Sequence, residues 1–146
     1  CVSVMPVALP ETAAEENVIY LTFDDGPCRY TEELLDVLDK YGAQATFFVI
    51  AGNNAYLDLL PRIYEAGHSI GVHACCHDYD RLYSSAASYL DDLVAARQTV
   101  YELTGEYVDL CRFPGGSTTA FHKLNNREKG AWEVVTVQLE RMDALF

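Results

Sequence analysis

Strand-like and helix-like segments alternate four times along this chain of 146 residues, and no hairpin turn joins any two of the strand-like segments. The strand-like segments are short runs rich in β-branched and aromatic residues, at 18–23, 45–50, 68–73 and 107–113. Strands separated by helices pair in parallel, because each helix carries the chain back to the start of the next strand. The first run is apolar at nearly every position, which is typical of a strand covered on both faces. The sequence therefore predicts an α/β fold.

Residues that favour helix ends bound the helix-like segments. Thr31 is expected to cap the first helix, and Gly42 and Gly105 suit the left-handed position that follows a helix. We expect helices at 31–41, 57–66, 84–104 and 127–142, with His122 in a loop. A closed (β/α) barrel needs more than four strand-helix units and typically about 250 residues. The expected fold is thus the N-terminal part of a distorted (β/α) barrel, with four strand-helix units and an incomplete sheet.

Composition excludes several classes of partner. A net charge of −12 disfavours binding to nucleic acid or to an anionic membrane, because both carry negative charge. No apolar run reaches the roughly 18 to 20 residues that a transmembrane helix needs, so none is expected in this chain. We expect residues 1–16 to form a leader or linker and residues 17–146 to form one domain. The five cysteines leave at least one thiol unpaired within the chain, and free thiols are expected.

Candidate reactive residues stand at the ends of three strand-like segments, which is where parallel α/β folds gather their chemistry. Asp24 and Asp25 end the first segment, His73 and His77 the third, and Arg112 the fourth. Each signal also has a simpler interpretation. An Asp-Gly-Pro sequence is often only a turn, two histidines at this spacing are more often incidental than metal-binding, and an arginine can form an ordinary surface ion pair.

The combination favours a metal site. One carboxylate and a His-x₃-His pair form the ligand set of a catalytic zinc site that keeps a position open for water. A second carboxylate beside that site supplies the base that such a water needs. A closed structural site of His73, Cys75, Cys76 and His77 is the alternative, because thiolate and imidazole both suit zinc.

Three motifs, in this order, resemble those of the polysaccharide deacetylase family, the NodB-homology domain. They are Thr22-Phe-Asp-Asp-Gly-Pro27, His73 with His77 after Gly67-His-Ser-Ile-Gly71, and Arg112-Phe-Pro-Gly-Gly116. The resemblance implies a distorted (β/α) barrel and a metal-dependent hydrolase. Its implied substrate is an N-acetylated polysaccharide of the peptidoglycan or chitin type, from which it removes N-acetyl groups outside the cytoplasm, as a secreted or cell-surface protein.

The resemblance also implies a role for each motif residue. Asp25, His73 and His77 bind a divalent metal ion, with zinc expected, and water bound to that ion attacks the acetamide. Asp24 is the general base, and Arg112 pairs with it and holds its orientation. The backbone N–H near Gly115 helps to stabilise the tetrahedral oxyanion.

The chain departs from the family pattern at two points. Ala74 stands where family members usually carry a Ser or Thr that ties down the loop by a hydrogen bond. Nothing after Ser117 matches the family's later Asp-Trp and Leu-x-His motifs, the second of which carries the general acid. We therefore expect a domain that is incomplete at its C-terminal end. We expect it to be marginally stable or to self-associate through an open sheet edge, and to show little or no deacetylase turnover on N-acetylglucosamine oligomers. The alternative function is a non-catalytic remnant that binds metal or glycan without turnover.

Overall fold

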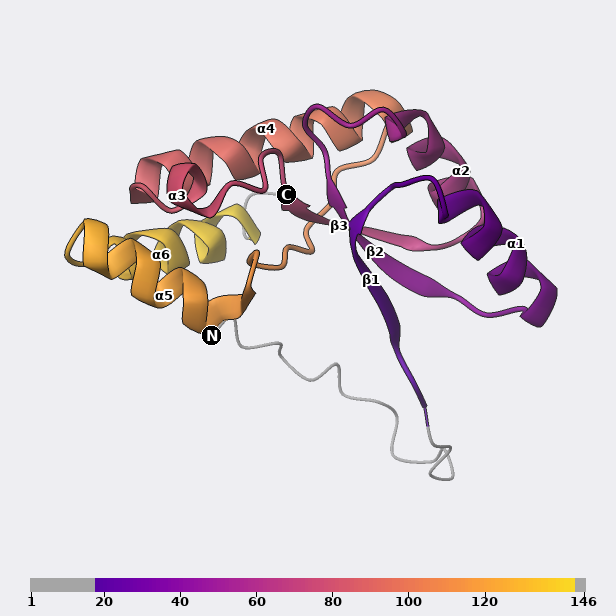
Figure 1. Cartoon of the computed structure of the whole chain (residues 1–146), viewed down its shortest axis with the longest axis horizontal. Coiled ribbons are helices and arrows are strands. Elements are labelled where there is room, and N and C mark those ends of the chain that lie inside the picture. Colours follow the sequence, from indigo (N-terminus) through magenta and orange to yellow (C-terminus); the bar gives the residue numbers. More distant parts are fainter. Residues whose placement is uncertain (1–17, 144–146) are drawn as a thin grey trace.

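The structure is a computed structural model that describes residues 18–143, so the expected leader or linker at 1–16 lies outside the described residues. Helices separate the three strands along the described chain, and only helices follow the third strand (Figure 1). In order they are β1 (Leu21–Gly26), α1 (Thr31–Tyr41), β2 (Ala45–Ile50), the 3₁₀ turn η1 (Leu57–Leu59), α2 (Leu60–Glu65), β3 (Ser69–Ala74), α3 (Tyr79–Leu82), α4 (Ala86–Thr104), α5 (Gly116–Arg127) and α6 (Ala131–Asp143).

The three strands form one parallel sheet in the order β1-β2-β3, which confirms the predicted α/β class. The expected fourth strand at 107–113 is reduced to a single parallel bridge between Cys111 and Val72 of β3. Val72 donates its N–H to the Leu110 carbonyl and accepts from the Arg112 N–H. The residues before this bridge are mostly exposed, so only the last part of the segment lies along the sheet. This short contact is sufficient to place Arg112 beside the end of β3.

Helices α1, α2 and α4 cover one face of the sheet. The core on that face joins alternating strand residues to side chains from α1, α2 and α4; its members include Phe47, Val49, Ile70, Val72, Leu35, Leu38, Leu60, Ile63, Leu93 and Val100. Burial of each large side chain contributes about 1.5–3 kcal/mol. The opposite face carries Asp24, Phe48 and Gly71, which are paired with one another across the three strands. The site described below is built on this second face.

The first strand is not covered on both faces, contrary to the sequence prediction. β1 pairs only with β2, so its other edge has no partner strand among residues 18–143. Ile19 and Tyr20, just before β1, have exposed fractions of 83% and 81%. An apolar run therefore marks an edge strand here, because burial depends on neighbours that the local sequence does not specify.

Most helix ends lie where the sequence predicts them. Gly42 and Gly105 have φ angles of +60° and +80° and end α1 and α4 as predicted. The helix expected at 57–66 is present as η1 and α2, and the Ser85 side chain caps α4 by accepting from the Ser88 N–H. Thr31 is the first residue of α1 rather than its cap, and its Oγ1 accepts a hydrogen bond from the Cys28 N–H.

Two helices were not predicted. α3 is a single turn after His77, and α5 replaces the expected loop, so that His122 lies on a helix. Only Ala120 and Leu124 of α5 are buried, and its first residues are Gly, Ser and Thr, so the segment carries little helical periodicity. α5 and α6 lie side by side next to α4, away from the sheet (Figure 1). None of the helices within residues 18–143 has the length and apolar content that crossing a bilayer requires.

Candidate metal centre

Two strands lose their regular register at the residues expected to bind metal. In β1 the pairing with β2 skips Asp25, and in β3 it skips His73, so each is the extra residue of a bulge. Asp25 has φ +65°, a left-handed conformation that Asp adopts more readily than most residues. The bulge at Asp25 interrupts the alternation of side chains and thereby lets Asp24 and Asp25 serve one site. Both bulges lie at the carboxyl ends of their strands.

The predicted ligand atoms converge. Asp25 Oδ1 lies 3.5 Å from His73 Nε2 and 3.4 Å from His77 Nε2. One ligand atom from each of the three residues lies within 4.8 Å of the others, and no other such group of His, Cys, Asp or Glu occurs within residues 18–143. His73 is buried, whereas Asp25 and His77 face solvent in part. The site is therefore anchored on one side and accessible on the other.

The His73 ring is held by a backbone carbonyl. Its Nδ1 lies 2.8 Å from the Arg112 carbonyl oxygen, which can only accept a hydrogen bond, so Nδ1 carries the proton. In the neutral imidazole Nε2 is then the unprotonated nitrogen, and it faces Asp25. A ring N–H donated to a carbonyl is the usual second contact of a metal-binding histidine, and it fixes the tautomer. Two imidazoles and one carboxylate with this orientation fit a divalent metal ion such as zinc.

Asp24 and Arg112 form the ion pair that the resemblance implied. Arg112 Nη1 lies 2.8 Å from Asp24 Oδ1 and 3.1 Å from Thr22 Oγ1. On its way to β1 the Arg112 side chain crosses β2, where its guanidinium carbon lies 4.0 Å from the centre of the Phe48 ring. Gly71 makes room for that ring, because a Cβ at this position would lie 2.6 Å from a Phe48 ring atom. The base candidate is thus positioned by residues of every strand in the sheet.

Gly115 lies at the start of α5, with φ +73°. Tyr79 connects it to the metal ligands: a Cβ on Gly115 would lie 3.0 Å from the Tyr79 hydroxyl, and the Tyr79 ring centre lies 5.1 Å from that of His77. The backbone N–H expected to face an oxyanion is therefore at the same end of the fold as the metal ligands.

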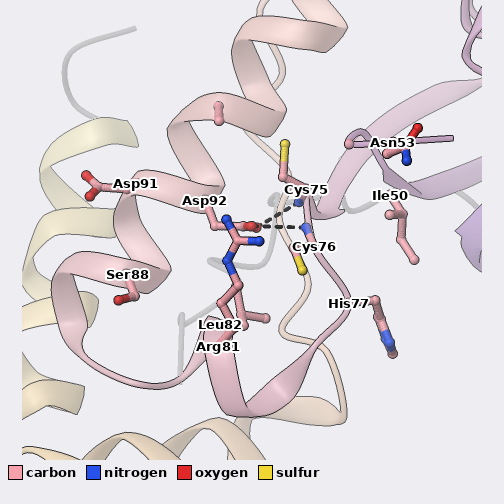
Figure 2. A pocket seen from close by; sticks show the side chains of 12 residues that line it. Ile50, Asn53, Cys75, Cys76, His77, Arg81, Leu82, Ser88, Asp91 and Asp92 are labelled. Atoms are coloured by element: carbon pink, nitrogen blue, oxygen red, sulfur yellow. Dashed lines mark hydrogen bonds between the residues drawn. The ribbon is translucent and has the colours of Figure 1, made fainter.

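Sequence reasoning missed Tyr79 and Asp92. Asp92, on α4, accepts hydrogen bonds from the backbone N–H groups of Cys75 (2.7 Å) and Cys76 (3.0 Å), in the loop between the two histidines (Figure 2). Burial raises the pKa of Asp92, while the two N–H donors and Arg81 lower it. In the sequence, Asp92 is one of several acidic residues in a predicted helix. Only its contact with Cys75, which forms on folding, distinguishes it from the others.

The cysteines do not form the alternative thiolate site. Cys28, Cys75 and Cys76 are free thiols, as expected, and no cysteine within residues 18–143 belongs to the candidate metal cluster. Burial raises the pKa of the Cys75 thiol, and Asp92 and Cys76 raise it further. A protonated thiol is a poor metal ligand. The carboxylate and imidazole set is therefore the one that the fold brings together.

Comparison with known proteins agrees with this geometry. Residues 11–131 match the family described as "Polysaccharide deacetylase". The chain belongs to the polysaccharide deacetylase family. A peptidoglycan-N-acetylglucosamine deacetylase of Bacillus cereus is 34% identical over 132 residues, which are 88% of this chain and 48% of that protein. The chain spans about half the length of the bacterial deacetylases that it matches.

Solved structures of the family share the fold. The catalytic domain of peptidoglycan N-acetylglucosamine deacetylase from Eubacterium rectale superposes with a TM-score of 0.77 at 33% identity, covering 94% of this chain and 62% of that one. A family 4 acetyl xylan esterase from Clostridium thermocellum, solved in complex with a cobalt ion, has a TM-score of 0.60 at 29% identity, covering 73% and 54%. The three-stranded sheet and its helices are thus part of the distorted barrel of this family.

Proposed function

We propose that this chain carries the metal ligands and the base of a hydrolase that removes N-acetyl groups from an N-acetylated polysaccharide of the peptidoglycan or chitin type. The observation that carries the proposal is the convergence of Asp25, His73 and His77 beside the Asp24–Arg112 pair. Membership of the polysaccharide deacetylase family supports it, as do relatives that bear the names peptidoglycan and chitin deacetylase. We place the activity outside the cytoplasm, where such polymers occur.

Asp25, His73 and His77 would hold a divalent metal ion, and we propose zinc. The ligand atoms lie within 4.8 Å of one another, and the His73 tautomer leaves Nε2 free. A cobalt ion in the acetyl xylan esterase supports a divalent ion in this family. When bound, such an ion lowers the pKa of water and polarises a carbonyl oxygen. Side-chain and backbone groups of the chain would accept the proton and stabilise the oxyanion.

Asp24 would accept the proton of the attacking water. Its Oδ1 is occupied by Arg112 Nη1, so Oδ2 is the atom available for the proton. Arg112 contacts Thr22 and the face of Phe48 as well, and these contacts restrict the carboxylate to one orientation. The Gly115 N–H, at the start of α5, would donate to the oxyanion that develops on the acetyl group.

A second candidate is a domain that binds metal or glycan without turnover. The chain has four histidines. Two are the proposed ligands, His68 is buried in the core, and His122 lies exposed on α5. Within residues 18–143, no histidine is therefore left at the site to act as the acid that protonates a leaving amine. This observation favours the second candidate.

Metal binding and acetate release from N-acetylglucosamine oligomers, both measured on the full chain, test the proposal. Asp25→Asn should abolish metal binding and turnover together, whereas Asp24→Asn should retain the metal and lose turnover. Metal binding without acetate release by the unchanged protein would support the second candidate. Stoichiometric metal binding that survives Asp25→Asn would refute the proposed site.

A further inference from the structure

The loop between the two metal-binding histidines has no polar side chain of its own to hold it. It consists of Ala74, which is the last residue of β3 and pairs with Ile50 of β2, and of Cys75 and Cys76. The Ala74 carbonyl accepts from the Ala51 N–H at 2.8 Å. The next two N–H groups, of Cys75 and Cys76, donate to Oδ2 and Oδ1 of Asp92. Each oxygen of one carboxylate therefore holds one residue of the loop.

The loop is confined from the other side by backbone. A Cβ on Gly52 would lie 2.0 Å from the Cys75 carbonyl oxygen, so the chain after β2 touches the loop directly. A cleft of about 730 Å³ adjoins it, lined by Cys76, His77 and Asp92 among others (Figure 2). Ala74 is buried and Cys75 packs against the core, whereas Cys76 faces this open volume, and the two bonds to Asp92 join the loop directly to α4.

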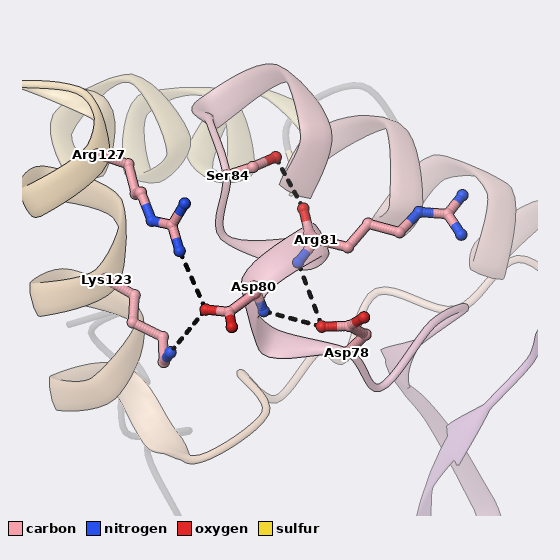
Figure 3. Close-up of polar contacts among 6 residues, drawn as sticks. All are labelled: Asp78, Asp80, Arg81, Ser84, Lys123 and Arg127. Atoms are coloured by element: carbon pink, nitrogen blue, oxygen red, sulfur yellow. Dashed lines mark hydrogen bonds and ion pairs between the residues drawn. The ribbon is translucent and has the colours of Figure 1, made fainter.

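The loop is also fixed just after His77. Asp78 caps the short helix α3 by accepting from the N–H groups of Asp80 and Arg81, and Asp80 pairs with Lys123 and Arg127 of α5 (Figure 3). These pairs are exposed and each contributes little on its own. With the downstream end held by α3, the position of His77 depends on how Cys75 and Cys76 are held upstream.

Burial of a carboxylate is costly unless hydrogen bonds compensate for it. Asp92 makes no ion pair within 4.0 Å in the described part of the chain, and its burial is compensated by the two loop N–H groups and, at longer range, by the charge of Arg81. The Asp92 carboxylate is not in the metal cluster, and Figure 2 shows the His77 ring directed away from it. The direct contacts of Asp92 with this part of the site are therefore with the loop backbone.

We propose that Asp92 is a positioning residue of the metal site, whose carboxylate clamps the loop between His73 and His77 and sets the spacing of the two imidazoles. The proposal rests on the metal centre of the proposed function. It also explains how a chain with Ala74, which offers no side-chain hydroxyl, keeps this loop in place.

The test compares Asp92→Asn and Asp92→Ala with Asp91→Asn in the full chain. Asp91 is the neighbouring residue on α4, is exposed, and lines the same cleft, so its substitution removes the same charge without touching the loop. Asn retains one acceptor oxygen and turns an NH₂ group toward the second N–H, so it keeps one bond at most. Two readouts are used: amide hydrogen exchange of Cys75 and Cys76 without metal, and Co²⁺ affinity with the d–d absorption spectrum.

We expect Asp92→Asn to speed exchange of at least one of the two amides by about tenfold or more, and Asp92→Ala to speed both. Loss of an outer-shell partner typically weakens metal affinity by about 10- to 100-fold, and we expect Co²⁺ affinity to fall in that range with an altered spectrum. Asp91→Asn should match the unchanged chain in both readouts. If Asp92→Ala does not fold, Asp92→Glu, which keeps both oxygens on a longer side chain, should give an intermediate loss of affinity.

Two results would overturn the inference, and they can be told apart. If the unchanged chain binds Co²⁺ and Asp92→Asn binds it equally well with the same spectrum, Asp92 does not position the site, even if the variant unfolds more easily. If the unchanged chain binds no Co²⁺, the proposed metal centre fails and the inference fails with it.

Discussion

The Nδ1 atom of His73 lies 2.8 Å from the carbonyl oxygen of Arg112, and the guanidinium of the same arginine lies 2.8 Å from Oδ1 of Asp24. One residue therefore contacts a metal ligand through its backbone and the base through its side chain. Substitution of the side chain leaves the carbonyl in place, so the two functions should be separable by mutation.

Arg112→Met tests this separation. The variant keeps the carbonyl that holds His73 but loses the contacts to Asp24 and Thr22. We expect Co²⁺ affinity within about twofold of the unchanged chain, while any deacetylase rate falls by about 100-fold, because a misplaced catalytic group costs roughly that much. Arg141→Met, on the exposed side of α6, is the matched control. A loss of metal affinity equal to the loss of rate would show that the side chain also supports the metal ligands.

Direct loss of a ligand should be more severe. We expect Asp25→Asn and His73→Ala each to weaken Co²⁺ binding by more than the 10- to 100-fold typical of an outer-shell change. Cys75→Ser should bind normally, because that thiol is outside the ligand cluster. Calorimetric titration measures all three. The reverse pattern, with binding lost in Cys75→Ser and kept in Asp25→Asn, would identify a thiolate site.

Gly71→Ala should disturb the base through packing. The added methyl would lie 2.6 Å from the Phe48 ring and 3.1 Å from Leu110 Cβ, so the ring that supports Arg112 has to move. Overpacking of this kind costs about 1–3 kcal/mol, which denaturant unfolding can measure. The double variant Gly71→Ala/Phe48→Leu should recover part of that loss. No recovery would mean that the clash is with the Leu110 side and not with the ring.

His68 should make stability depend on pH. It is 6% exposed, its Nδ1 has no hydrogen-bond partner within residues 18–143, and burial lowers its pKa from the ordinary value of 6.5. The unfolded chain then binds a proton more readily than the folded chain, so the free energy of unfolding falls as the pH drops below about 6.5. We expect His68→Asn to show a shallower decline between pH 7 and 5 than the unchanged chain. Equal slopes would show that His68 titrates alike in both states.

Within residues 18–143 one edge of β1 has no partner strand, and we expect this edge to drive self-association. Ile19 and Tyr20 are apolar and exposed next to that edge, and such edges pair readily with other chains. We expect the double variant Ile19→Lys/Tyr20→Lys to weaken dimerisation by about tenfold in sedimentation experiments. Val37→Lys, on an exposed position of α1, adds charge elsewhere and should have no effect. If the unchanged chain sediments as a monomer at every concentration tested, this prediction is wrong.

The sequence predicted features that depend on neighbouring residues in the chain. The buried runs of β2 and β3, the glycines that end α1 and α4, and the site residues Asp25, His73 and His77 all carry local signals. Features that depend on distant contacts were missed. α5 buries only two side chains, and β1 is exposed because no strand among residues 18–143 lies along its other edge. Asp92 reaches a loop 16 and 17 residues earlier. None of these leaves a pattern in a short window of sequence.

The bulges at Asp25 and His73 have a consequence for protein design. Each inserts one residue into a strand, and a regular pleat would send neighbouring side chains to opposite faces. Grafting the three ligands onto the strand ends of another parallel sheet would therefore fail if only the side chains were copied. The extra residue of each bulge has to be included in the design. The number of residues in each strand therefore determines this site as much as the identity of its ligands does.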